Sequence, residues 1–162
     1  MIAKLVPGGQ TGVDRAALDA ALELGIPCGG WCPKGRKAEG GTIPDRYPLE
    51  ETPSAGYSQR TKWNVRDSDA TLILTWGEPT GGTLLTLDEC DAAGKPRLVV
   101  DLSAGGDRTA QVSAAREWVA RLGSGTLNVA GPRASRHPAV YGRATAFGRA
   151  ILSEAGEAGL DT

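Results

Sequence analysis

Residues 70–83 read Ala-Thr-Leu-Ile-Leu-Thr-Trp-Gly-Glu-Pro-Thr-Gly-Gly-Thr, and this stretch decides the fold. Its first six residues form a consecutive apolar run, which is typical of a central parallel strand that is covered on both faces. A glycine-rich turn follows, and residues 84–93 predict a helix that ends at Gly94, with Pro96 just beyond. The stretch therefore predicts a strand, a tight turn and a helix, the repeating unit of an α/β protein.

The same unit recurs along the chain. Residues 2–6 predict a buried strand, which is followed by the turn Gly8–Gly12 and a helix that stops at Gly25. Further strands are expected at residues 26–30, 97–102 and 126–130, with helices capped by Ser58 and by Asp107, and a last helix from 139 to about 155. This alternation predicts an α/β fold, a Rossmann-like three-layer sandwich with a mostly parallel sheet of about five strands and helices on both faces.

Length and composition limit the class of protein. The 162 residues fit one ligand-binding domain over 1–162, and 40% hydrophobic with 23% charged residues excludes a disordered chain. The apolar runs are strand-sized, and Met1–Val6 enters a strand without the features of a signal peptide, so we expect a cytoplasmic protein without a membrane partner. The net charge of −1 gives no bias toward nucleic acid, which we do not expect as a partner.

The three cysteines do not predict a metal site. Cys28 and Cys32 lack zinc-ribbon spacing, and no second pair of ligands follows them. We expect these two residues and Cys90 to be reduced and to lie in or beside the core.

Two glycine-rich turns lie at the edge where ligands bind in such folds, beyond the carboxyl ends of the strands. Glycine lets a ligand approach the backbone, and a helix N-terminus offers unpaired N–H groups to a phosphate. The first turn is neither a P-loop nor a dinucleotide fingerprint, because basic residues stand where an acidic one is expected about 20 positions on. Alone, it fits a structural turn equally well; two such turns favour a shared phosphate site. The predicted residues here are Gly8, Gly9, Gln10, Thr11, Gly12, Gly81, Gly82 and Thr83.

Several polar residues are candidates to complete this site. Asp14 fits either a stabilising charge at a helix N-terminus or a contact to a ligand hydroxyl or amine. Residues 31–57 form a long loop without apolar periodicity, a feature that is often functional, and its Lys34 and Arg36 are either surface charges or part of a closing loop. We also expect Arg60, Thr61 and Asn64 on one helix face, and Arg133 beyond the last strand. No nucleophile–base pair stands out, so catalytic residues stay unknown.

Taken together, these motifs resemble the “putative molybdenum carrier” family. The resemblance runs over nearly the whole chain and is carried by the segments 8–15, 30–39, 43–44, 47–49, 60–61, 64–65, 67–69 and 127–133. It implies a Rossmann-like fold related to molybdenum cofactor carriers and to LOG-type phosphoribohydrolases. It also implies a small phosphorylated ligand, either a nucleotide or the molybdenum cofactor, and a homo-oligomer, a dimer or a tetramer.

The resemblance leaves two functions open. The LOG-type enzymes carry Pro-Gly-Gly-x-Gly-Thr-x-x-Glu at the second turn, whereas here Thr86 stands in place of the catalytic Glu. A binding or carrier protein is therefore the first hypothesis. A nucleotide-processing N-glycosidase is the second, with Asp14, Glu39 or Glu89 as its carboxylate. An NAD(P)-dependent oxidoreductase is the least favoured.

Overall fold

Four parallel strands form the central sheet of the protein, β1 (Lys4–Leu5), β6 (Ala70–Thr75), β7 (Arg97–Asp101) and β8 (Thr126–Ala130). The computed structural model describes residues 1–153. The strands lie in the order β1-β8-β6-β7, and every neighbouring pair is parallel. All six residues of β6 are buried, as expected for a central strand. The predicted mostly parallel α/β architecture is confirmed.

The predicted strand at residues 26–30 is reduced to one bridge. Cys28 pairs in parallel with Leu5, the Leu5 N–H donates to Pro27 O at 2.9 Å, and the Gly29 N–H donates to Leu5 O at 3.0 Å. The ladder stays short because Pro27 has no N–H to donate and Gly30 leaves the extended conformation with a φ of 107°. The sheet thus has four strands with a fifth segment at its edge.

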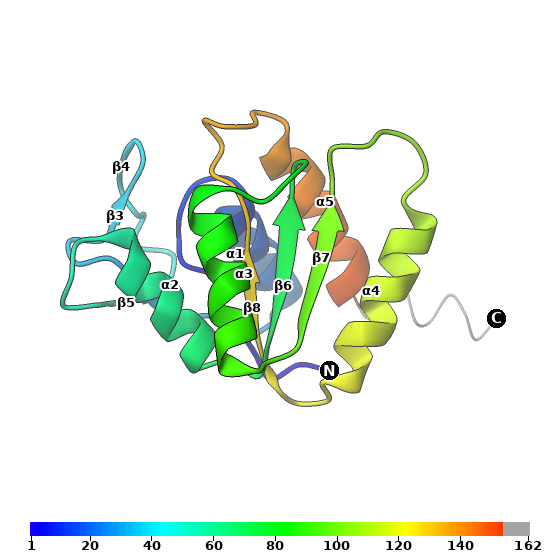
Figure 1. The fold of residues 1–162 in the computed structure, drawn as a ribbon, viewed down its shortest axis with the longest axis horizontal. Helices are drawn as coiled ribbons and strands as arrows, with labels where there is room; N and C mark the ends of the chain where they lie inside the picture. The colour runs from blue at the N-terminus through cyan, green and yellow to red at the C-terminus, as the bar shows by residue number, and fades with distance from the viewer. Residues whose placement is uncertain (154–162) are drawn as a thin grey trace.

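Helices cover both faces of the sheet (Figure 1). Helices α1 (Val13–Leu24), α4 (Thr109–Arg121) and α5 (Val140–Leu152) pack together on one face, and α2 (Tyr57–Arg66) and α3 (Gly81–Ala93) pack together on the other. The apolar core lies between the sheet and the first group, where Leu5, Val13 and Phe147 are buried. Among residues 1–153, no helix has the length and hydropathy needed to cross a membrane.

The predicted helix ends need three corrections. Ser58 does not cap α2, because Gly56 occupies that position and the helix begins at Tyr57. Asp107 lies one residue before the cap position of α4, although its carboxylate accepts a hydrogen bond from the Thr109 N–H at 2.9 Å. Helix α3 begins at Gly81, so the second glycine turn forms its first helical turn. The predicted end of the last helix near Ala155 lies outside the described residues.

The long segment 31–57 is folded onto the domain. It contains two small sheets, β2 (Trp31–Cys32) with β5 (Glu50–Glu51) and β3 (Lys37–Ala38) with β4 (Gly41–Thr42). A second apolar cluster anchors it to α1, with buried members Leu18, Cys32, Ala38, Ile43, Tyr47 and Leu49.

The order of the strands indicates where a ligand-binding crevice lies in the sheet. Counting from β8 as the first strand, β1 becomes the second, the Cys28 segment the third, β6 the fourth and β7 the fifth. The order across the sheet then reads 3-2-1-4-5, as in a Rossmann fold. The chain leaves β8 toward α5 on one face and leaves β6 toward α3 on the other. Ligands of such sheets bind at this switch point, here between β8 and β6.

Candidate ligand-binding site

A cavity of about 150 Å³ opens at this switch point. Helices α2 and α3, the start of α1 and the turn that follows β8 supply its walls. Of the residues predicted from the sequence, it is lined by Gln10, Asp14, Arg60, Thr61, Gly81, Gly82, Thr83 and Arg133. Two segments far apart in sequence, 10–14 and 80–86, therefore lie around one space.

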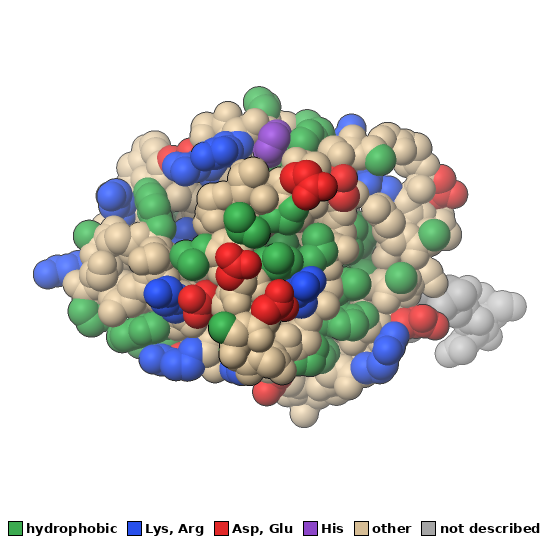
Figure 2. Space-filling model, viewed as in Figure 1, with side chains coloured by type: hydrophobic (Ala, Val, Ile, Leu, Met, Phe, Trp, Pro, Cys, Tyr) green, Lys and Arg blue, Asp and Glu red, His purple; other side chains and the backbone are tan. Residues whose placement is uncertain are grey.

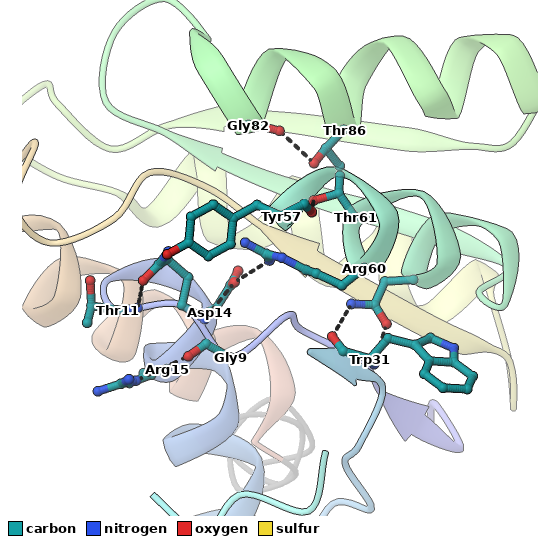
Figure 3. A network of polar contacts seen from close by, with 12 residues as sticks. Gly9, Thr11, Asp14, Arg15, Trp31, Tyr57, Arg60, Thr61, Gly82 and Thr86 are labelled. Atoms are coloured by element: carbon teal, nitrogen blue, oxygen red, sulfur yellow. Dashed lines mark hydrogen bonds and ion pairs between the residues drawn. The ribbon is translucent and has the colours of Figure 1, made fainter. Parts of the chain in front are cut away.

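The second glycine turn is open to this cavity. Helix α3 starts at Gly81, and within residues 1–153 the N–H groups of Gly81 and Gly82 have no hydrogen-bond acceptor. A Cβ built on Gly82 would meet no atom within 4 Å. Figure 3 shows Gly82 and Thr86 on α3, across from Asp14 and Arg60. The residues that carry these N–H groups line the cavity, and the partial positive charge of a helix N-terminus lies beside it, an arrangement that suits an anion.

The first glycine turn, in contrast, is filled by the protein's own atoms. A Cβ on Gly8 would lie 1.9 Å from Arg60 Nη1, and one on Gly9 would lie 2.5 Å from Leu49 Cδ1. Gly12, with a φ of 82°, would bring a Cβ within 2.5 Å of the Pro132 carbonyl oxygen. These glycines make room for side chains and backbone, which gives each of them a structural reason.

Three amides in and just after the first turn also have acceptors inside the protein. The Gln10 N–H donates to Asp14 Oδ2 at 3.1 Å, the Thr11 N–H donates to Gln10 Oε1 at 3.1 Å, and the Val13 N–H donates to Pro132 O at 3.3 Å. The hypothesis that amides of both turns meet at one anion therefore fails for Gln10 and Thr11, and Gly8, Gly9 and Gly12 do not line the cavity. Its side chains Gln10 and Asp14 line the cavity in place of its backbone.

Asp14 and Arg60 form a buried ion pair in the cavity wall. Arg60 Nη1 lies 3.1 Å from Asp14 Oδ2, and Asp14 is 3% exposed. Burial raises the pKa of Asp14, and the neighbouring Arg60 charge opposes that shift without cancelling it. The Arg60 guanidinium occupies the space that the missing side chain of Gly8 leaves free. It also lies over the Tyr57 ring, whose centroid is 5.5 Å from Arg60 Cζ. Both neighbours position the guanidinium. Breaking such a pair from one side typically costs about 3–5 kcal/mol.

Two further arginines bring positive charge to the rim. Arg133 Nε lies 3.9 Å from Glu39 Oε2, and Arg136 Nη2 lies 4.0 Å from the position of a Cβ on Gly81. Arg136 has no ion pair within residues 1–153. In Figure 2, basic side chains lie beside the single histidine at the edge toward which the strands of Figure 1 point. Arg136 is thus an uncompensated cation next to the open amides of α3.

Other predicted residues lie outside this cavity. Arg36, at a φ of 53°, donates to four carbonyl oxygens of the long segment, including Pro44 O and Tyr47 O at 2.8 Å each, and so holds that segment together. Asn64 bonds the backbone of Trp31, and Lys34 is exposed. Thr11 donates to Glu39. Gly8 and Asn64 border a separate void of about 10 Å³.

Tyr57 and Arg136 are among the cavity-lining residues that the predicted site lacked. Arg136 could have been predicted from the sequence, because it follows the last strand at the ligand edge, only three residues after Arg133. Tyr57 had no signal, since its position depends on where α2 packs against α3.

Asp14 is the one carboxylate among the described residues that line the cavity. Within the described part of the chain, no three His, Cys, Asp or Glu side chains gather closely enough to hold a metal ion. Cys32 and Cys90 are buried and Cys28 is half-buried, as expected for reduced cysteines in or beside the core. Burial raises the pKa of all three thiols, so none is poised as a reactive thiolate.

Comparison with known proteins shows the family of the chain. The model of the circularly permutated YpsA SLOG family matches residues 5–152. The chain belongs to this family. In the strand order described above, the first strand of a Rossmann sheet comes last in the chain, as β8. This order agrees with the circular permutation in the family's description.

A solved structure from Syntrophus aciditrophicus SB, described as a “Putative molybdenum carrier protein”, is also similar. It is 44% identical to the chain, with a TM-score of 0.85, and the match covers 94% of this chain and 96% of that one. No curated protein matches the chain. The resemblance that the sequence motifs indicated is thereby confirmed at the level of the family.

Proposed function

We propose that the protein binds a small phosphorylated, nucleotide-like ligand, with its phosphate at the N-terminus of α3. The observation that carries this proposal is the pair of unpartnered amides at Gly81 and Gly82, which line a cavity at the switch point beside Arg136. Backbone amides, a helix dipole and a nearby guanidinium are the groups that bind phosphate in many proteins.

The proposed ligand class rests on chemistry that nucleotides and phosphorylated pterins share. Both carry a phosphate on a flat heterocycle, and the half-buried Tyr57 ring in the cavity wall offers an aromatic surface for such a ring. The name of the Syntrophus relative supports the molybdenum cofactor as one candidate cargo. A carrier role needs binding alone, so it requires no catalytic set.

Isothermal titration of the purified protein tests the proposal. AMP, ADP, ATP, molybdopterin and inorganic phosphate are each titrated into the wild type, Arg136→Ala and Arg121→Ala. Arg121 is an exposed arginine on α4 outside the cavity, and it serves as the matched control. We expect saturable binding that Arg136→Ala weakens about tenfold and Arg121→Ala leaves unchanged, because a hydrogen bond to a charged group contributes about 1.5–3 kcal/mol. Absence of binding by every phosphorylated compound in the micromolar range would reject the function.

One observation favours hydrolysis of an N-glycosidic bond as a second candidate. Of the three carboxylates considered from the sequence, Asp14 alone lines the cavity; Glu39 bonds Thr11 and Ser135, and Glu89 lies 4.0 Å from Lys62. The raised pKa of Asp14 suits a general acid. Thr86, in place of the hydrolase Glu, donates to Gly82 O at 3.0 Å. Release of free base from nucleoside monophosphates, abolished in Asp14→Asn, would establish this reaction; equal release by that variant would exclude the role.

Two expectations concern the protein in its cell. We propose a homo-oligomer, as the family resemblance implies, and a cytoplasmic location. Light scattering coupled to size-exclusion chromatography tests the first: a mass near 16.8 kDa, that of one chain, would contradict it.

A further inference from the structure

Gln10 in the first turn and Asp14 at the start of α1 are buried, and each keeps one polar atom without a partner among the described residues. Asp14 is 3% and Gln10 is 8% exposed, and both line the cavity. Both hydrogen bonds that Asp14 accepts, from Arg60 and from the Gln10 N–H, go to its Oδ2 atom. Within residues 1–153, nothing donates to Oδ1. The nearly sealed carboxylate therefore keeps one free acceptor atom.

The Gln10 side chain is oriented by the backbone around it. Its Oε1 atom accepts from the Thr11 N–H at 3.1 Å and from the Glu39 N–H at 2.9 Å. Two N–H donors at one atom fix that atom as the oxygen, so the other end of the amide is the Nε2 donor. Nε2 has no acceptor among the described residues. It is also not sealed, since Arg60 Nε is the one fully enclosed side-chain polar atom without a partner there. Gln10 Nε2 and Asp14 Oδ1 therefore meet open space, and the space that their residues line is the cavity.

An acidic group is unexpected in a site for a phosphate. A carboxylate repels an anion, so Asp14 is suited to contact a part of the ligand that donates hydrogen bonds. Its ion pair with Arg60 offsets the negative charge at 3.1 Å and limits the repulsion. A free acceptor and a free donor on neighbouring side chains match sugar hydroxyls, each of which donates and accepts.

The strand order supports the position of the acidic residue, although the phosphate site proposed at α3 follows the fourth strand of that order and not the first. In dinucleotide-binding Rossmann folds, the turn after the first strand holds the phosphate, and an acidic residue about 20 positions on accepts a hydrogen bond from the ribose. Because β8 takes the place of the first strand here, the second strand is β1, and Asp14 follows it at the start of α1.

From these observations we infer that Gln10 Nε2 and Asp14 Oδ1 form a subsite for the vicinal diol of a ribose, across the cavity from the phosphate at α3. This inference rests on the proposed function and narrows the ligand class to ribonucleotides and ribose phosphates. Figure 3 shows the opposition of Asp14 and Gly82 on which it depends.

Paired titrations test the diol subsite. AMP, 2′-deoxy-AMP and 3′-deoxy-AMP are titrated into the wild type, Asp14→Asn and Gln10→Glu. Each variant keeps the shape of its side chain but can replace the free acceptor with a donor, or the free donor with an acceptor. Asp88→Asn, an exposed change on α3, is the control. Circular dichroism and thermal melts show whether each variant is folded.

We expect the wild type and Asp88→Asn to prefer AMP over at least one deoxy analogue by about tenfold, the effect of one hydrogen bond to a charged group. The preference should fall to less than about threefold in a folded Asp14→Asn or Gln10→Glu. Should a variant not fold, the wild-type preference alone decides. Equal wild-type affinity for all three nucleotides would overturn the diol subsite and leave the phosphate site standing. A wild type that binds neither AMP nor phosphate would overturn both.

Discussion

The two glycine-rich turns look alike in sequence and differ in what surrounds them. The turn Gly8–Gly12 packs against Arg60, Leu49 and Pro132, and its Gln10 and Thr11 amides bond the protein's own oxygens. The turn Thr80–Thr83 leaves the Gly81 and Gly82 amides without an acceptor in residues 1–153, beside a cavity and with open space around Gly82. Glycine is needed in the first turn because there is no room for a side chain. In the second, it leaves room for a ligand. The same motif can therefore serve the fold in one place and binding in another.

The largest expected effect comes from filling the closed turn. Gly12→Ala forces a non-glycine residue to a φ of 82° and places its Cβ 2.5 Å from the Pro132 carbonyl oxygen. We expect the free energy of unfolding to fall by more than about 2 kcal/mol, because strain and a backbone clash add. Urea denaturation measures this loss. A variant as stable as the wild type would show that the first turn has space for a ligand.

The second test fills the open turn. Gly82→Ala adds a methyl group where nothing lies within 4 Å, so the helix should gain about 0.4–1 kcal/mol of stability while the ligand loses access to the amides. The matched control is Gly142→Ala, which adds a methyl group in open space on α5. We expect both variants to melt at or above the wild-type temperature and only Gly82→Ala to bind AMP more weakly, by about tenfold. Unchanged affinity in Gly82→Ala would place the ligand elsewhere.

The smallest effect concerns the Glu39 clasp, the hydrogen bonds by which Glu39 joins the first turn to the turn after β8. Glu39 accepts hydrogen bonds from Thr11 and from Ser135, whose Oγ lies 2.6 Å from Glu39 Oε2. Burial raises the pKa of Glu39, but the hydrogen bonds from Ser135 and Thr11, with the Arg133 charge, outweigh it and hold the pKa below its usual value.

A lowered carboxyl pKa stabilises the fold above the unfolded pKa of about 4.5, and this stability is lost as the pH falls through the lower folded value. Glu39→Gln should therefore lose less stability than the wild type when the pH is lowered from 6 to 3. Denaturation curves at several pH values measure the difference. Parallel curves for the two proteins would show that the clasp does not titrate.

How far the sequence predicts this molecule depends on the range of the interactions involved. Local patterns were sufficient for β6 and for the helix ends at Gly25 and Gly94, because burial, periodicity and glycine caps act over a few residues. They were not sufficient for the role of Gly8, since the side chain that fills its space is Arg60, which is 52 positions away. Arg36 shows the same limit: its carbonyl partners are set by the path of residues 43–49, and no pattern in the sequence marks that path.

The most direct test of the central claim is to follow backbone amides while a ligand is added. In ¹⁵N-labelled protein, titration with AMP should shift the N–H resonances of Gly81 and Gly82 in a saturable way and leave those of Gly9 and Gly12 nearly unchanged. Saturable shifts at Gly9 and Gly12 with none at Gly81 and Gly82 would contradict the account, because the anion would then bind at the turn that the protein itself fills.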